Sequence, residues 1–135
     1  MKYFCALAFA LLTSSAMAGT SAGHGMGGQF SRFDPVVAEH NRTGELFRIE
    51  GHCQSACTVF LGIKNVCVQP SARLLFHAGH DRQRNISTKW TNHMLAAYKP
   101  ALRQYLVSNH YMDTLAFHTI SGRELIDKFG YKACP

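Results

Sequence analysis

A serine and a histidine lie within the chemically richest part of the chain, the stretch from Gly51 to His77. Ser55 stands among small residues where a strand is expected to give way to a short helix, and His77 closes a later apolar strand. A serine on such a turn, with a histidine in reach, forms a nucleophile and its general base. The pattern predicts acyl transfer, in which Ser55 attacks a carbonyl carbon and His77 accepts the serine proton.

Both residues also fit ordinary structural roles. Ser55 precedes Ala-Cys-Thr and is placed to cap the helix that follows, because a serine oxygen satisfies free amides at a helix start. A histidine that ends an apolar strand is more often a core residue with its own hydrogen bonds. The Ser55–His77 pair is therefore a hypothesis that depends on whether the two side chains share one space.

Two rival chemistries use neighbouring residues. His77 and His80, with Asp81 beside them, have the side chains that bind zinc or copper. This spacing on a loop is weak evidence in a chain with eight histidines, so no metal or cofactor is predicted. Cys53 or Cys57 as a thiolate nucleophile requires a free thiol, which an oxidising compartment disfavours.

The N-terminus has the three parts of a secretory signal peptide. Lys2 is positively charged, residues 4–12 are an apolar run too short to cross a bilayer, and Ala16-Met-Ala18 is a small-x-small cleavage site. We therefore expect a signal peptide over 1–18 and a single domain over 19–135, in the periplasm of a bacterium or secreted. No membrane attachment is expected after cleavage.

Four cysteines remain once the signal peptide, with Cys5, is removed. An even number in a small exported domain predicts disulfides. We favour Cys57 with Cys67, which closes a short loop, and Cys53 with Cys134, which ties back the C-terminus. Cys53 with Cys57, about one helical turn apart, is the alternative. A zinc site is a weaker interpretation, because no close Cys-x-x-Cys pair is present.

Composition excludes two classes of protein. A content of 47% hydrophobic and 16% charged residues is typical of a packed domain and not of a disordered chain. The net charge of +6 comes from scattered arginines with no basic run among aromatic residues, which argues against nucleic acid as a partner.

Apolar periodicity and turn residues predict alternating helices and strands. Pro100 is expected to kink the longest helix, Ser87 to cap its start, and Gly130 to end the last helix. The glycine-rich residues 19–26 are expected to form a flexible leader. The expected elements are helices at 29–40, 55–61, 88–109, 112–118 and 122–129, and strands at 45–50, 66–68 and 73–77.

Several motifs follow one another in a recognisable order. They are the pair Gly27-Gly28 with the helix and strand after it, the serine turn Gly51–Ser55, the strand and turn at Val66–Pro70, the strand ending Leu75-Phe-His77, and the closing helix after Ser121. This order resembles the Clp protease proteolytic subunit and its crotonase-fold relatives, over most of the mature chain. The resemblance implies an α/β fold with a truncated ββα spiral core, here stabilised by disulfides.

The resemblance also implies roles for backbone amides. In that family a glycine pair supplies oxyanion amides, so Gly27 or Gly28 is expected to hold the oxyanion. The amide of Ala56, at the positive end of the helix that follows Ser55, is the expected second donor.

Two features depart from the family. The third triad member is expected near Ala116 or Phe117, where there is no carboxylate; Asp113 is the nearest candidate to orient His77, and Asp127 the next. The strands that precede the glycine pair in the family are also missing, so either the sheet is truncated or a second copy or another partner completes it.

The sequence therefore predicts an exported protein of this fold, with a Ser-His pair that hydrolyses peptides or acyl esters. The alternative is a catalytically inactive, disulfide-stabilised binding or interaction module of the same fold, which the missing acid favours.

Overall fold

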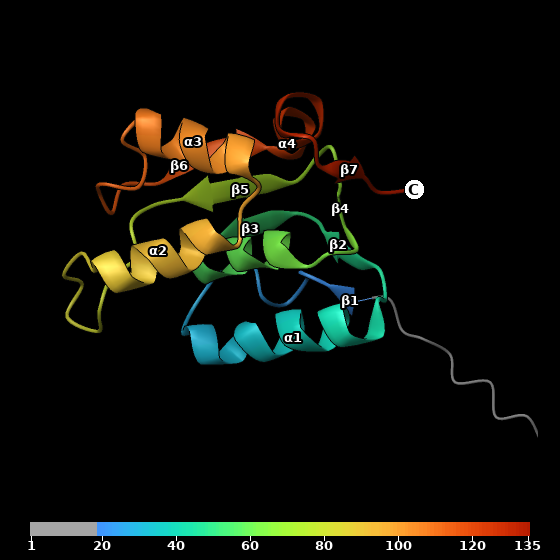
Figure 1. Cartoon of the computed structure of the whole chain (residues 1–135), viewed down its shortest axis with the longest axis horizontal. Coiled ribbons are helices and arrows are strands. Elements are labelled where there is room, and N and C mark those ends of the chain that lie inside the picture. Colours follow the sequence, from blue (N-terminus) through green and yellow to red (C-terminus); the bar gives the residue numbers. More distant parts are fainter. Residues whose placement is uncertain (1–18) are drawn as a thin grey trace, which may run out of the picture.

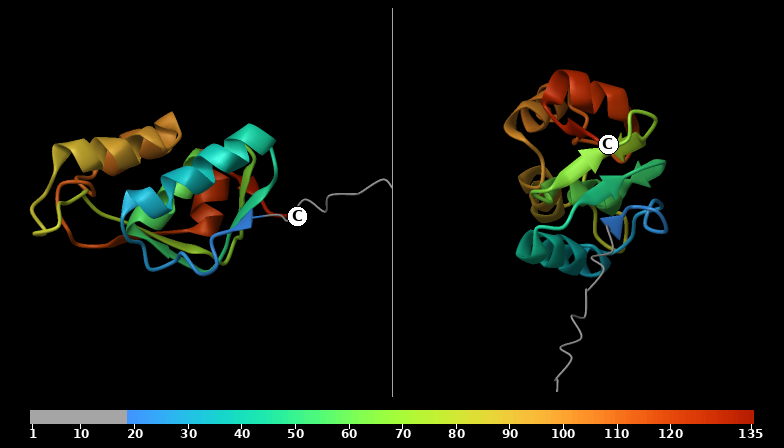
Figure 2. Two further views of the ribbon diagram at one scale, coloured as in Figure 1. Left: turned by 90° about the horizontal axis from the view of Figure 1, so that it is seen from below. Right: turned by 90° about the vertical axis from the view of Figure 1, so that its right-hand side faces the viewer.

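The computed structural model describes residues 19–135 and has a mixed α/β fold (Figure 1). The signal peptide predicted over 1–18 lies outside the described residues. Two small sheets form the centre of the molecule, with helix α1 on one side and helices α3 and α4 on the other (Figures 1 and 2). Within residues 19–135, no helix is long and apolar enough to cross a membrane.

The first sheet is entirely parallel. Its strands are, in spatial order, β1 (Gly19–Thr20), β2 (Phe47–Ile49), β4 (Val66–Val68) and β7 (Lys132–Ala133). The inner strand β4 is buried along its whole length, as expected for a parallel strand covered on both faces.

The second sheet is mixed. Strand β3 (His52–Gln54) runs parallel to β5 (Arg73–Phe76), and β5 pairs antiparallel with β6 (His118–Ser121). The chain passes from the first sheet to the second between β2 and β3, at Gly51. A φ of +64° at this residue suits glycine, which has no Cβ to obstruct the turn.

Local capping signals place the helices. They are α1 (Asp34–Thr43), α2 (Thr88–Ala96), α3 (Pro100–Ser108) and α4 (Gly122–Phe129), with 3₁₀ helices η1 (Phe30–Arg32) and η2 (Ser55–Gly62). The Ser87 hydroxyl accepts from Trp90 N–H, and Gly130 ends α4 in the left-handed conformation, as predicted. Pro100 does more than kink the long helix, because it separates α2 from α3.

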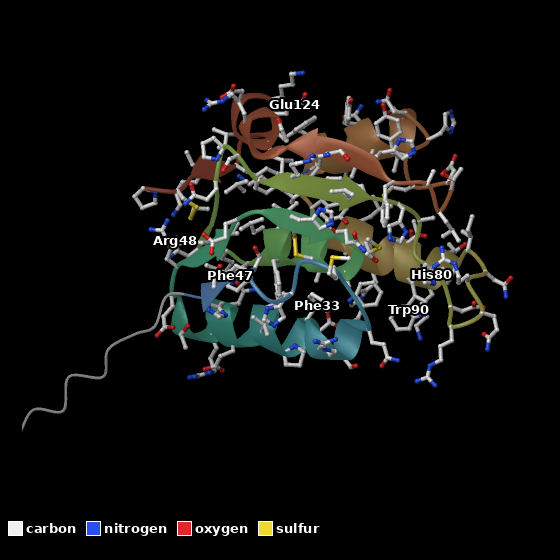
Figure 3. The ribbon with its side chains drawn as sticks, turned by 180° about the vertical axis from the view of Figure 1, so that it is seen from behind. Phe33, Phe47, Arg48, His80, Trp90 and Glu124 are labelled. Atoms are coloured by element: carbon white, nitrogen blue, oxygen red, sulfur yellow. A yellow bond between two sulfur atoms is a disulfide. The ribbon has the colours of Figure 1, made fainter. Side chains whose placement is uncertain are left out.

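Helix η2 lies at the centre of the core. All six of its residues from Ala56 to Leu61 are buried, in agreement with their continuous apolar sequence. Phe60 packs against Phe33 at the start of α1 and against Phe47 of β2, with ring centroids 5.3 and 4.6 Å apart. Figure 3 shows Phe33 and Phe47 between the sheets and α1. The core thus fixes the element that begins with Ser55.

The predicted flexible leader is wrong. Gly19 and Thr20 form β1 in register with Phe47 and Arg48, and Ser21 is fully buried. Glycine makes this possible, because a Cβ on Gly19 would overlap the His40 ring. Residues 19–26 are therefore an edge of the fold, although their composition is typical of a linker.

The helix predicted over 112–118 is also absent. Residues from 112 onward form turns and bends, and β6 begins at His118. Strand β6 pairs with β5 from Phe76–His118 to Arg73–Ser121. Cross-strand pairing over more than forty positions has no local signal, and it overrides the helical spacing of this segment.

Both disulfides are present, but with a different pairing from the favoured one. Cys53 bonds to Cys57, and Cys67 bonds to Cys134. Cys67 lies in β4, and Cys134 directly follows β7. Because β4 and β7 pair in the first sheet, the two cysteines lie side by side. Cys57 faces back toward β3 instead. The alternative pairing of Cys53 with Cys57 is therefore the one the fold contains.

Candidate functional site

Ser55 occupies a left-handed position at the junction of β3 and η2. Its φ is +55°, a conformation otherwise found among the described non-glycine residues at Arg84 and His110. A left-handed conformation costs an ordinary residue about 1–2 kcal/mol. Such strain is concentrated at functional turns, where the surrounding structure enforces it.

The helix-cap interpretation of Ser55 is wrong. Ser55 is the first residue of η2, and the N-cap position belongs to Gln54, whose side chain makes no capping bond. Among residues 19–135, the Ser55 hydroxyl has no hydrogen-bond partner. The hydroxyl is therefore free to react or to bind a ligand.

Several covalent and polar contacts fix the Ser55 backbone. The Cys53–Cys57 disulfide encloses it, and both sulfur-bearing residues are fully buried. The Thr58 hydroxyl donates to the Ser55 carbonyl at 2.7 Å and lies 2.6 Å from the buried Tyr98 hydroxyl. Burial raises the pKa of Tyr98 far above its ordinary value, so the phenol stays neutral and keeps this bond.

Gly27 packs directly against Ser55. An added Cβ at Gly27 would lie 2.9 Å from the Ser55 Cβ and 3.0 Å from the Gln54 carbonyl, and its φ of +74° also favours glycine. The Gln54 side-chain amide donates to the Met26 carbonyl at 3.0 Å and holds the segment there. The glycine pair predicted to lie near the nucleophile does so.

The predicted oxyanion amides differ in availability. The Gly27 N–H donates to the His24 carbonyl at 3.2 Å and is already used. Gly28 N–H has no acceptor among residues 19–135. Ala56 is the second residue of η2, where helical amides have no partner within the helix. Gly28 and Ala56 are thus the better donors to an oxyanion, and Gly27 allows its segment to lie close to Ser55.

His77 is a buried, neutral base. Its side chain is only 4% exposed, and burial, with the nearby positive charges of His80 and Arg84, lowers its pKa. Nδ1 lies 2.6 Å from the Ala78 carbonyl. Because a carbonyl only accepts, Nδ1 carries the proton, and Nε2 is left with its lone pair.

The expected acid, Asp113, makes no hydrogen bond to His77 among residues 19–135. Asp113 Oδ2 lies 2.8 Å from His110 Nδ1 at the surface, and the Phe117 ring packs on His77 with centroids 5.2 Å apart. Among the described residues, the His77 ring makes its hydrogen bond to a carbonyl and none to a carboxylate. The structure therefore puts an aromatic ring beside the position expected for the acid.

Ser55 and His77 line the same cavity, which has a volume of about 780 Å³. No hydrogen bond joins the Ser55 hydroxyl to the His77 ring among the bonds of residues 19–135. Sequence reasoning missed most of the other lining side chains, because they come from several loops and elements that are far apart in the sequence. These are Met26, Phe30, Gln54, Arg82, Arg84, Trp90, Leu115 and Phe117.

The rival chemistries are less well supported. The His77 and His80 rings stack with centroids 5.8 Å apart, but each Nδ1 faces a backbone carbonyl. Within residues 19–135, no three His, Cys, Asp or Glu side chains form a metal-binding cluster. The thiol nucleophile is ruled out in this structure, since Cys53 and Cys57 are bonded to each other.

Comparisons of the chain with protein-family models, with curated proteins and with solved structures find no match.

Proposed function

We propose that this protein is a serine hydrolase of peptides or acyl esters, with Ser55 as nucleophile and His77 as general base. The observation that carries the proposal is the left-handed Ser55, fixed at the β3–η2 junction and facing the same cavity as a neutral histidine. A serine presented on a strained strand-to-helix turn, with a base in the same cavity, is the arrangement that acyl transfer requires.

The chemistry follows from the available groups. Ser55 Oγ attacks the carbonyl carbon as His77 Nε2 takes its proton, and the Gly28 and Ala56 amides bind the resulting oxyanion. One such donor lowers the activation barrier by about 3 kcal/mol. The Ala78 carbonyl fixes the tautomer of His77 as a carboxylate would, but it carries no full charge to stabilise the imidazolium.

The Clp-protease and crotonase-like fold is part of the same proposal. Consecutive strands β2 and β3 belong to different sheets, as do β4 and β5, and η2 lies between the two pairs. This alternation supports a ββα spiral core. The two disulfides support an exported protein, because such bonds persist in oxidising compartments.

A non-catalytic binding module of the same fold is the second candidate. It is favoured by the lack of a carboxylate on His77 and of a hydrogen bond between Ser55 and His77 among the described residues. In that case the cavity binds a ligand without cleaving it.

Labelling with a fluorophosphonate probe distinguishes the two candidates. The mature protein is expected to form a covalent adduct on Ser55, and the variants Ser55→Ala and His77→Ala are expected to lose at least a hundredfold in labelling rate. Removing a nucleophile or its base commonly costs more than that. Intact-mass spectrometry and gel fluorescence measure the adduct.

Two matched variants serve as controls. Ser108→Ala, at the end of α3, and His110→Ala, at the surface beside Asp113, are expected to label like the parent protein. Folded parent protein that forms no adduct, or an adduct that persists in Ser55→Ala, would contradict the hydrolase and leave the binding module.

A further inference from the structure

We propose that the cavity beside Ser55 takes an acyl compound that carries a negative charge on its acyl part. This inference rests on the proposed hydrolase for its catalytic step, but its binding step holds for either candidate function. It follows from two arginines and several aromatic rings that line the same space as Ser55 and His77.

The two arginines are available to an anion. Arg82 and Arg84 line the cavity and are exposed, and neither takes part in an ion pair or a side-chain hydrogen bond among residues 19–135. The lining includes one carboxylate, Asp81, which accepts from the Asn85 backbone amide at 2.9 Å and its side-chain amide at 3.3 Å. Asp81 therefore organises the loop.

A closed loop presents these arginines. His80 and Ile86 form an antiparallel bridge, Asp81 N–H donates to the Asn85 carbonyl at 3.0 Å, and Arg84 N–H donates to the Asp81 carbonyl at 3.1 Å. Arg84 has a left-handed φ of +64°. The loop follows directly from His77, so the base and both guanidinium groups belong to one continuous segment.

A third guanidinium lies near the expected oxyanion donor. An added Cβ on Gly28 would lie 3.5 Å from Arg32 Nη1. Arg32 ends η1, and it also has no ion-pair partner among the described residues. The space around the Gly28 amide is therefore positive, which favours anions over neutral ligands.

Large apolar side chains also line the cavity. Phe30 stacks on Trp90 with centroids 5.2 Å apart, and Phe117 covers His77. Met26 and Phe117 are 74% and 50% exposed, so their apolar surface is accessible to a ligand in the cavity. Figure 3 shows Trp90 and His80 at the same end of the molecule. Aromatic walls with a few charged groups suit a small amphiphilic ligand.

The chemical step is a hydrolysis. Ser55 Oγ bonds to the acyl carbon, and the bond from that carbon to the leaving group breaks. The serine proton passes through His77 to the leaving group. Water then attacks the acyl carbon as His77 takes a proton from it, and His77 passes this proton to Ser55 Oγ as the bond between Oγ and the acyl carbon breaks. The acid is released with its second carboxylate still bound near Arg82 and Arg84.

Two matched substrate pairs test the charge requirement. The p-nitrophenyl monoester of adipic acid and p-nitrophenyl hexanoate differ only in a terminal carboxylate. Succinyl-capped and acetyl-capped peptide p-nitroanilides of one sequence provide the same comparison for a peptide. We expect kcat/KM to be at least fivefold higher for the charged member of one pair, and the preference to shrink at high salt. The pair that shows it identifies the source as an acyl ester or a peptide.

Arginine variants locate the effect. Arg82→Gln/Arg84→Gln is expected to bring the ratio close to one, whereas Arg123→Gln, on the exposed face of α4, is expected to keep it. Equal kcat/KM for both members of both pairs, or an unchanged ratio in the double variant, would overturn the proposal.

Binding is measured separately from catalysis. Trp90 is the single tryptophan of the chain and lines the cavity, so its fluorescence reports occupancy. Ser55→Ala is titrated with monomethyl adipate and with methyl hexanoate, which differ only in the terminal carboxylate, and tighter binding of monomethyl adipate that depends on Arg82 and Arg84 is expected. This result without hydrolysis of any substrate would refute the hydrolase and leave the charge preference standing. Equal binding of the two esters by this variant would overturn the charge preference whatever the catalytic outcome.

Discussion

The two disulfides constrain very different lengths of chain, one in each sheet. Cys67–Cys134 connects β4 to the residue after β7 over a separation of 67 positions, whereas Cys53–Cys57 connects β3 to η2 over 4. In the chain-entropy model, such loops contribute about 4 and about 2 kcal/mol respectively to the free energy of unfolding. The short disulfide is fully buried, and Cys134 is half-buried at the C-terminus.

The difference separates stability from site geometry. The long disulfide holds a two-residue edge strand whose residues are both exposed. The short one encloses Ser55, whose left-handed backbone is the costly part of the site. We therefore expect the Cys67–Cys134 disulfide to stabilise the first sheet, and the Cys53–Cys57 disulfide to fix the backbone geometry of Ser55 beside the second sheet.

Removal of the long disulfide is expected to have the largest effect on stability. The variant Cys67→Ala/Cys134→Ala should lose about 4 kcal/mol of unfolding free energy in urea, because its denatured chain regains the entropy of a long loop. Its fluorophosphonate labelling rate, measured well below the unfolding midpoint, should match the parent. A tenfold slower labelling of the folded variant would show that the long disulfide also affects the geometry of the site, and would contradict the division of roles between the two disulfides.

Removal of the short disulfide is expected to act on the site more than on the fold. The variant Cys53→Ala/Cys57→Ala should lose only about 2 kcal/mol of stability. Its labelling rate should fall roughly tenfold, because relaxation of a left-handed residue releases about 1–2 kcal/mol and 1.4 kcal/mol corresponds to tenfold. Urea titration and labelling kinetics measure the two effects, with the long-disulfide variant as the matched control. Unchanged labelling would show that Thr58 and the core hold Ser55 unaided.

Local features of this fold follow from the sequence, and long-range pairings do not. Ser87, Ser121 and Gly130 end or begin helices as predicted, because a cap depends only on residues three or four positions away. The cysteine pairing depends on β4 lying beside β7, which no local pattern shows.

In the candidate site, too, the residues of short local motifs follow from the sequence, whereas the contacts between distant segments do not. Gly27 packs against Ser55, and Ser55 and His77 line one cavity; each of the three belongs to a short motif that the sequence shows. Asp113 is predicted only as the carboxylate nearest to the position at Ala116 or Phe117 that the family resemblance implies. The segment leads into β6, the Asp113 carboxylate pairs with His110, and the Phe117 ring packs on His77. No sequence motif indicates a role for Arg82 and Arg84, because only the folded chain places their loop at the cavity that Ser55 lines.

The pH dependence of labelling is the smallest expected effect, and it tests His77 at the end of β5. Burial lowers the pKa of His77 below 6.5, so the neutral base persists as the pH falls through that value. The midpoint of the decline in labelling rate should therefore lie below pH 6.5. The unfolded chain, with its ordinary histidine, binds more protons in this interval. The contribution of His77 to the free energy of unfolding should therefore be fully present above pH 6.5 and should decrease as the pH falls toward the folded pKa. His110→Ala should retain both profiles, and a labelling midpoint above pH 6.5 would show that a negative charge, and not burial, controls His77.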